Sequence, residues 1–89
     1  MVDRSDAYIL GRLVERTRLL IAVSDEIPIE TKLQTQGVLK MFQAEIARPE
    51  HEQDRVRVRA HHAMLYDDLA PYADIEALLA AMRNFISYL

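Results

Sequence analysis

The segment from Asp74 to Leu89 constrains the fold of this chain most, because it carries the pattern of an amphipathic helix. Asp74 precedes the apolar run and is placed to cap the helix by accepting hydrogen bonds from free N–H groups of the first turn. The large apolar residues recur at steps of three and four and share one helical face: Ile75, Leu79, Met82, Ile86 and Leu89. This face needs a partner, so we expect the rest of the chain to pack against it.

Helix breakers are scarce in the sequence. The 89 residues include only two glycines and three prolines, and valine and isoleucine are scattered rather than alternating. Both features favour helices over a sheet. We therefore predict an all-α fold, a single helical domain over residues 1–89 in which four helices form an antiparallel, bundle-like arrangement.

Prolines and capping residues set the expected boundaries. Pro28 and Pro49 each disfavour helical geometry at the preceding residue and can occupy the first turn of a new helix. Asp3 or Ser5 is the expected cap of the first helix. The four helices are expected at about 4–23, 28–47, 50–69 and 74–89. The expected core face of the first helix consists of Leu10, Leu13, Val14, Thr17, Leu20 and Ile21, with Ile9 at its edge.

The second helix has apolar residues on two nearly opposite sides. Ile29 and Leu33 occupy one side, and a larger set occupies the other: Val38, Leu39, Phe42 and Ile46. A bend at Gly37 would let both sets face one core. The alternative is a straight helix between two partners.

The third helix contains a short alternating stretch, Arg55 to Arg59, that resembles a strand. No other segment could pair with it, so we predict a helix. Its core face is expected to consist of Val58, His62, Leu65 and Leu69. A smaller opposite face, with Val56, Ala60 and Ala63, could admit a close neighbour.

Composition excludes several classes of protein. Cysteine is absent, which excludes disulfides and thiolate metal sites. The charged N-terminal residues do not form a signal peptide, and no run approaches the roughly 18 apolar residues of a membrane span. We therefore expect a cytoplasmic protein without membrane partners. The net charge of −3 disfavours nucleic-acid binding by the chain alone, and leaves it possible only as part of a complex.

Histidines and carboxylates do not form a convincing catalytic or metal site. On a helix, His61 and His62 point about 100° apart, and His51 lies about 15 Å away along the axis. We expect His62 to be partly buried and hydrogen-bonded, and His61 to be exposed. Asp67 and Asp68 are adjacent and face different ways, so a pair for acid–base catalysis is not indicated. No catalytic residue, metal ligand or cofactor is predicted.

Arginines of the third helix and the preceding connector are the best candidates for phosphate contacts. Arg55 and Arg59 lie one turn apart, and Arg48 precedes them. Neighbouring Glu52 and Asp54 can neutralise this group. A solvated, salt-bridged surface and a phosphate-binding surface both fit this pattern.

Apolar residues away from the expected core face suggest a partner interface. Tyr8 and Leu19 lie on the opposite side of the first helix. The sequence also ends on large apolar residues, which must pack inside the bundle or against another chain. The expected interface consists of Tyr8, Leu19, Phe85, Ile86, Tyr88 and Leu89. Scattered surface apolar residues remain the alternative.

The residues Asp6-Ala7-Tyr8-Ile9-Leu10-Gly11-Arg12-Leu13 resemble a family motif. The stretch is similar to Asp-Pro-Ala-Tyr-x-Leu-Gly-Arg-Leu near the C-terminal end of the large subunit of type I-C CRISPR surveillance complexes. It lacks the proline after the aspartate. That region is also made separately as a helical small subunit. The resemblance implies a small all-helical antiviral-defence subunit that packs beside RNA-binding subunits and helps hold displaced or guide-paired DNA, with no catalytic residue.

The sequence also bears on two other functions. The stretch from Arg12 to Leu20 resembles the first helix of chorismate-mutase-like enzymes, but later arginines and lysines lack the spacing needed to bind a dicarboxylate. We therefore predict a non-enzymatic helical protein-interaction subunit. The alternative is a free-standing acidic helical adaptor or inhibitor, a homodimer that docks on a basic protein partner.

Overall fold

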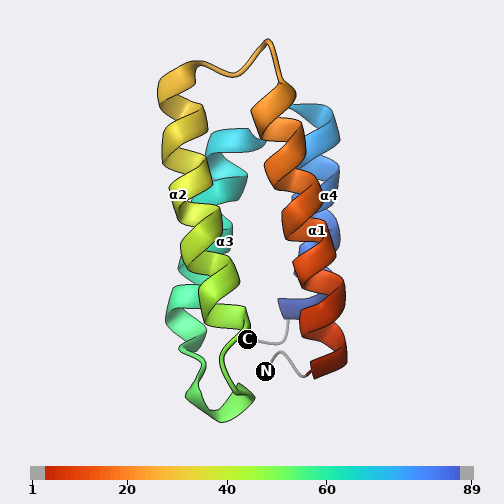
Figure 1. Ribbon diagram of the computed structural model, residues 1–89, viewed down its shortest axis with the longest axis vertical. Coiled ribbons are helices and arrows are strands. Elements are labelled where there is room, and N and C mark those ends of the chain that lie inside the picture. The colour runs from red at the N-terminus through yellow and green to blue at the C-terminus, as the bar shows by residue number, and fades with distance from the viewer. Residues whose placement is uncertain (1–3, 87–89) are drawn as a thin grey trace.

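Four α-helices form the architecture of the described part of the chain. The computed structural model describes residues 4–86, in which α1 (Arg4–Val23), α2 (Ile29–Ile46), α3 (Arg55–Leu69) and α4 (Ala73–Ile86) run alternately up and down (Figure 1). A short 3₁₀ helix, η1 (Glu50–Glu52), precedes α3. The predicted all-α, bundle-like fold is confirmed. No helix within residues 4–86 is long and apolar enough to cross a membrane.

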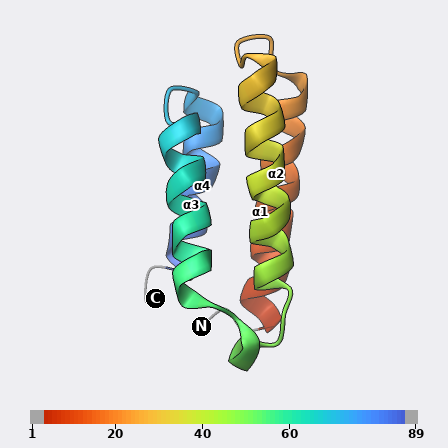
Figure 2. The same ribbon diagram turned by 90° about the vertical axis from the view of Figure 1, so that its left-hand side faces the viewer.

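The helices form two antiparallel hairpins, α1–α2 and α3–α4, that pack face to face (Figure 2). Each helix contacts its neighbours in the chain, and α4 closes the bundle by packing against α1. The resulting body measures 38 × 19 × 17 Å. At the end that carries the α1–α2 connector, the α1–α2 hairpin reaches beyond the α3–α4 hairpin.

One hydrophobic core lies between the hairpins and receives side chains from all four helices. The expected stripe of α4 is buried at Ile75, Leu79, Met82 and Ile86, whereas Leu89 lies outside the described residues. The predicted face of α3 is buried as well, at Val58, His62, Leu65 and Leu69. In α1 the fully buried residues are Leu10, Val14, Thr17 and Ile21, while Leu13 and Leu20 are partly buried. Each large apolar side chain buried in this way contributes about 1.5–3 kcal/mol.

The first helix has the predicted bounds, and its end is shaped by a serine. Ser5 lies inside α1, so it is not the cap, and Asp3 lies outside the described residues. After Val23 the Ser24 hydroxyl accepts hydrogen bonds from the backbone N–H groups of Glu26 and Ile27, at 3.2 and 3.4 Å. Ile27 is only 4% exposed, so it anchors the connector in the core.

The second helix is continuous through Gly37, so of the two alternatives the unbroken helix is observed. Only one of its two apolar sets is buried, the one that contains Val38 and Phe42. Ile29 and Leu33 remain 67% and 69% exposed. A bend is not needed because the bundle does not bury both sides.

The third helix begins later than predicted. After η1 the backbone is extended at Gln53, and Asp54 caps α3 by accepting a 3.2 Å hydrogen bond from the Arg57 N–H. A buried carboxylate from α2 reinforces this start, because Glu45 Oε2 accepts from the Asp54 N–H at 2.9 Å. These two bonds place the helix start at Arg55 rather than at Glu50.

The fourth helix begins one residue earlier than predicted, at Ala73. The carbonyl of Tyr72 accepts hydrogen bonds from the N–H groups of Ile75 and Glu76, at 3.0 and 2.8 Å. Asp74 therefore lies inside the first turn and is not the N-cap.

Candidate interaction surface

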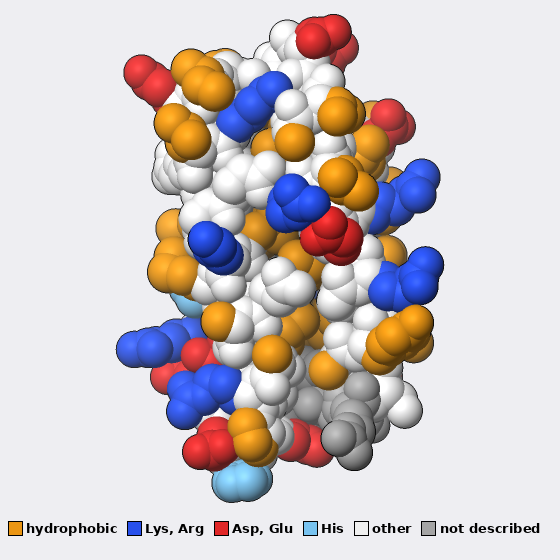
Figure 3. All heavy atoms as spheres, viewed as in Figure 1, with side chains coloured by type: hydrophobic (Ala, Val, Ile, Leu, Met, Phe, Trp, Pro, Cys, Tyr) orange, Lys and Arg blue, Asp and Glu red, His pale blue; other side chains and the backbone are white. Residues whose placement is uncertain are grey.

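Exposed large apolar side chains are concentrated on the α1–α2 hairpin. Among the described residues, four lie on α1, three on α2, two on α3 and none on α4. Figure 3 views this face of the molecule and shows hydrophobic and basic side chains side by side, with acidic side chains mostly toward its two ends. The exposed set consists of Tyr8, Ile9, Leu19, Val23, Ile29, Leu33, Met41, Val56 and Met64.

A shallow groove runs along the outer side of α1, and we call it the α1 groove. Its volume is about 570 Å³, and it is lined by Ile9, Arg12, Leu13, Glu15, Arg16 and Leu19. Helical periodicity brings these residues to one side, because they recur at steps of three and four along α1. The hydroxyl of Tyr8, one turn before Arg12, accepts a 3.4 Å hydrogen bond from that guanidinium.

An ion pair neutralises the only carboxylate of the α1 groove. Arg18 donates two hydrogen bonds to Glu15, at 2.6 and 3.0 Å, and both side chains are about half exposed. The hydrogen bonds to Arg18 lower the pKa of Glu15, and they raise the pKa of Arg18 in return. The positive charges of Arg12 and Arg16 therefore dominate the groove.

Two polar bonds fix α2 beside α1. Lys32 Nζ donates to the Ala22 carbonyl at 3.2 Å, and Gln36 Nε2 donates to the Arg18 carbonyl at 3.1 Å. These bonds set the register of the hairpin, and they add the positive charge of Lys32 to the face that carries Arg18.

The structure divides the predicted interface residues into three groups. Tyr8 and Leu19 are 67% and 49% exposed, on the side of α1 that faces away from the core. Phe85 is partly buried against the core, and Ile86 is part of the core at 5% exposure. Ile86 is therefore removed from the candidate surface, because its side chain is already covered. Tyr88 and Leu89 lie outside the described residues.

The predicted phosphate-binding arginines do not converge. The guanidinium of Arg48 lies 3.6 Å from the buried Glu45 carboxylate. Arg55 lines a cavity of about 480 Å³ beside η1, whereas Arg59 lines a different one of about 240 Å³ together with Arg83. All three predicted side chains are exposed, but they face separate parts of the surface.

The histidines have structural environments. His62 is 6% exposed, and its Nε2 lies 2.8 Å from the Leu79 carbonyl, between the rings of Phe42 and Tyr66. Burial lowers the pKa of His62, so the ring is neutral at neutral pH and donates its Nε2–H to the carbonyl. His61 is half-buried rather than exposed as predicted, and its Nδ1 is covered without a hydrogen-bond partner. Residues 4–86 contain no cluster of three or more His, Asp or Glu placed to hold a metal ion.

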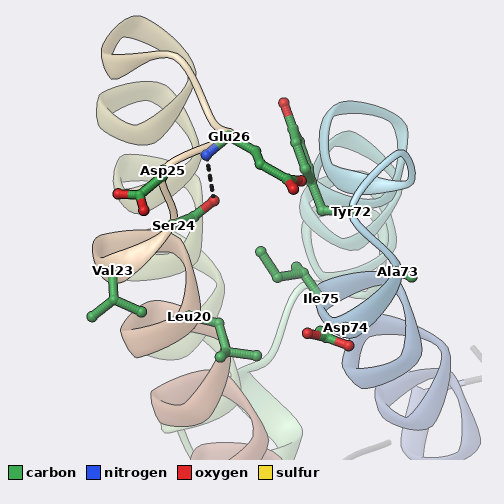
Figure 4. Close-up of a pocket in the computed structure, with 9 residues that line it drawn as sticks. All are labelled: Leu20, Val23, Ser24, Asp25, Glu26, Tyr72, Ala73, Asp74 and Ile75. Atoms are coloured by element: carbon green, nitrogen blue, oxygen red, sulfur yellow. Dashed lines mark hydrogen bonds between the residues drawn. The ribbon is translucent and has the colours of Figure 1, made fainter.

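A cleft between the α1–α2 connector and the start of α4 was not predicted (Figure 4). It measures about 480 Å³. The side chains of Leu20 and Ile75 point into it, and Glu26 reaches across it toward Tyr72, while Asp25 points away. Asp74 lies at its lower edge, and no basic residue lines it. Its carboxylates are visible in the sequence, but only the packing of α1 against α4 brings them together.

Both surfaces offer groups that can bind a partner. The α1 groove offers apolar contacts and two guanidinium groups, and the cleft offers apolar contacts and carboxylates. Comparison of the chain with protein-family models, with curated proteins and with solved structures gave no match.

Proposed function

We propose that this protein is a non-enzymatic helical subunit that works by binding other macromolecules. Its specific role is that of a small-subunit-like component of a type I-C CRISPR surveillance complex. In that complex it packs on protein partners and helps hold target DNA. The concentration of exposed apolar side chains on the α1–α2 hairpin carries this proposal.

The apolar surface supports a partner because such surfaces are uncommon on proteins that act alone. Monomeric soluble proteins rarely expose large contiguous apolar patches, and patches rimmed by polar residues mark interaction sites. On α1, Leu19 and Val23 lie one turn apart and are 49% and 72% exposed. On α2, Ile29 and Leu33 repeat this arrangement. Burying these four side chains against a partner would remove their apolar area from water.

The resemblance to the CRISPR large subunit supports the specific role, and it falls on α1. Within the matching stretch Leu10 is fully buried, whereas Tyr8 and Arg12 face outward. The motif therefore combines a core position with two positions available to a partner. The aromatic ring and the guanidinium are both common anchors of protein interfaces.

Contact with DNA fits this chain only within a larger assembly. The exposed guanidinium groups of Arg48, Arg55 and Arg59 suit phosphate groups. The net charge of −3, however, opposes DNA binding by the isolated chain. We expect a partner to supply most of the phosphate contacts.

Reconstitution tests the proposal. The chain is produced together with the proteins encoded beside its gene, and the mixture is separated by size-exclusion chromatography. We expect the chain to elute with them, and the assembly to bind target DNA more tightly with the chain than without it. The chain alone serves as the control and should not retain DNA at physiological salt. Separate elution together with an unchanged DNA affinity would exclude this function.

A second candidate is favoured by the carboxylate-lined cleft. A free-standing acidic adaptor or inhibitor, in particular a homodimer, would present Glu26 and Asp74 to a basic protein partner. Light scattering at tens of micromolar tests the dimeric form. A measured mass equal to that of one chain at this concentration would exclude the homodimer.

A further inference from the structure

The α1 groove combines apolar side chains with a local positive charge, although the whole chain is acidic. Ile9, Leu13 and Leu19 supply its apolar wall, and Arg12 and Arg16 lie between them. The net charge of the protein is −3. The net charge of the whole chain would attract a basic partner, whereas the positive charge of this groove favours an acidic one.

The electrostatic preference of the groove is for carboxylates. Glu15 is the only acidic residue that lines it, and its charge is already offset by Arg18 at 2.6 Å. A basic partner would meet Arg12 and Arg16 without a free carboxylate to pair with. An acidic partner would pair with both guanidinium groups, which bind carboxylates with two parallel hydrogen bonds.

The apolar residues make a protein helix a better occupant than nucleic acid. From Ile9 to Leu19 the groove extends about 15 Å along α1, at about 1.5 Å per residue, which matches three turns of a second helix. Leucine and isoleucine side chains pack into the grooves of such a helix. A sugar–phosphate backbone gains little from them, and single-stranded bases need aromatic platforms, of which Tyr8 is the one beside this groove.

We propose that the α1 groove binds an acidic amphipathic helix of a protein partner. The apolar stripe of that helix packs on Ile9, Leu13 and Leu19, and its flanking Asp or Glu residues pair with Arg12 and Arg16. This inference rests on the proposed function, because it names the chemistry of a protein partner.

Designed peptides provide the probe. Three fluorescent peptides have the length of five helical turns, and the first two carry leucine at every third or fourth position. The first has glutamate on both flanks of the leucine stripe, the second has lysine there, and the third has the residues of the first in scrambled order. Fluorescence anisotropy at low and at physiological salt measures their affinity for the full chain. We expect the glutamate peptide to bind at least tenfold more tightly than the other two, with the difference reduced by salt.

Paired variants locate the binding site. Leu19→Glu should weaken binding of the glutamate peptide at least tenfold, whereas Val56→Glu, at a 76% exposed position on α3, should leave it unchanged. Reversal of both charges in Arg12→Glu/Arg16→Glu should abolish the glutamate preference and create a preference for the lysine peptide. Lys40→Glu, at an exposed position on α2, is the control for a change of overall charge.

Four results would overturn the inference. With the peptides, these are an equal affinity for the glutamate and lysine peptides, or no binding of any of the three. With the variants, they are an equal loss of affinity for the glutamate peptide in Leu19→Glu and Val56→Glu, or an unchanged preference for the glutamate peptide in Arg12→Glu/Arg16→Glu. Binding of a DNA oligonucleotide that depends on Arg12 and Arg16 but not on Leu19 would assign the groove to nucleic acid instead. Self-association in sedimentation experiments that Leu19→Glu abolishes would assign it to a second copy.

The reconstitution experiment separates this inference from the proposed function. If the chain elutes with its partners and the groove variants elute in the same way, the subunit role stands and the groove assignment fails. If the chain never elutes with them but the peptide preference is observed, the groove assignment stands and the CRISPR role fails.

Discussion

The two hairpins of this bundle differ in where they place their apolar and polar groups. In the α3–α4 hairpin, polar side chains tie the two helices together: His62 bonds to the Leu79 carbonyl, and Tyr66 donates a 2.6 Å hydrogen bond to Glu76. Arg83 lies over the Tyr66 ring, 5.0 Å from its centre. In the α1–α2 hairpin two hydrogen bonds also join the helices, from Lys32 and Gln36 to backbone carbonyls of α1, but seven of the nine large apolar side chains that are exposed among the described residues lie on its surface.

This difference indicates which hairpin is completed by the chain itself. On the surface of the α3–α4 hairpin only Val56 and Met64 are large exposed apolar residues among those described. The α1–α2 hairpin contributes equally to the core through Leu10 and Phe42, yet leaves a second apolar side uncovered. A partner is therefore expected on the α1–α2 side.

The largest expected effect tests whether the hairpins share one core. Phe42→Ala in α2 should lower the free energy of unfolding by about 3–5 kcal/mol, and Leu79→Ala in α4 by about 2–5 kcal/mol, because both side chains are fully buried. Urea unfolding followed by circular dichroism measures both. One transition is expected in each variant. Two separate transitions would show that the hairpins unfold independently and that the core is not shared.

A smaller effect tests the polar tie inside α3–α4. His62→Ala should cost roughly 1–3 kcal/mol, because a buried hydrogen bond and ring packing are lost. The same residue makes stability depend on pH. Its pKa is lowered in the folded state, so as the pH falls below about 6.5 the unfolded chain binds a proton before the folded chain does, and stability decreases.

Urea midpoints at about pH 7.5 and about pH 5.5 measure this dependence. We expect the wild type to lose stability at the lower pH and His62→Gln to lose less. His51→Gln, at an exposed position, is the matched control. Identical pH dependence of the wild type and His62→Gln would show that this histidine does not contribute.

Substitution of the glycines in α1 and α2 should raise the stability of the protein rather than lower it. Gly37→Ala should stabilise the protein by about 0.5–1 kcal/mol, because glycine is a poor helix former and an added Cβ meets nothing within 4 Å. Gly11→Ala in α1 is the matched variant, with the same open surroundings. Thermal unfolding compares both with the wild type. A loss of stability in either variant would mean that the space around the added Cβ is already filled in the isolated protein.

The smallest expected effect concerns the exposed apolar side chains. Leu19→Gln and Leu33→Gln should each change the free energy of unfolding by no more than about 0.5 kcal/mol, since glutamine forms helices as well as leucine does. Val56→Gln on α3 should behave in the same way, and urea unfolding provides the measurement. A cost similar to that of a core substitution would contradict the exposure of these residues and remove the contrast between the hairpins.

Local patterns in the sequence predict most of the fold. The buried stripe of α4 follows from periodicity alone, because Ile75, Leu79 and Met82 lie on one helical face. The start of α3 does not, since it depends on the contact between Glu45 and the Asp54 N–H. The continuity of α2 through Gly37 cannot be predicted from periodicity either. The helix has two apolar sides, and the pattern does not determine which of them is buried in the bundle.

The candidate surface was predictable only in part. Tyr8 and Leu19 lie opposite the core face of α1 on a helical wheel, and both are exposed. Ile86 has the same apolar character, but the bundle covers it. The neutralisation of Glu15 by Arg18, which gives the α1 groove its charge preference, depends on side-chain geometry that the pattern does not contain.

The buried Glu45 has a consequence for how the two hairpins stay together in one chain. Bundles made of two hairpins joined by one connector can exchange a hairpin between two copies, a domain swap that needs the connector to straighten. Here the α3 end of the connector is held beside the end of α2: Gln53 Nε2 donates to the carbonyls of Ile46 and Arg48, at 3.2 and 2.9 Å, and Glu45 accepts from the Asp54 N–H. Straightening of the connector would break these three hydrogen bonds, and the Glu45 carboxylate would lose the one from the Asp54 N–H. The connector therefore keeps α3–α4 folded back on the chain that made it.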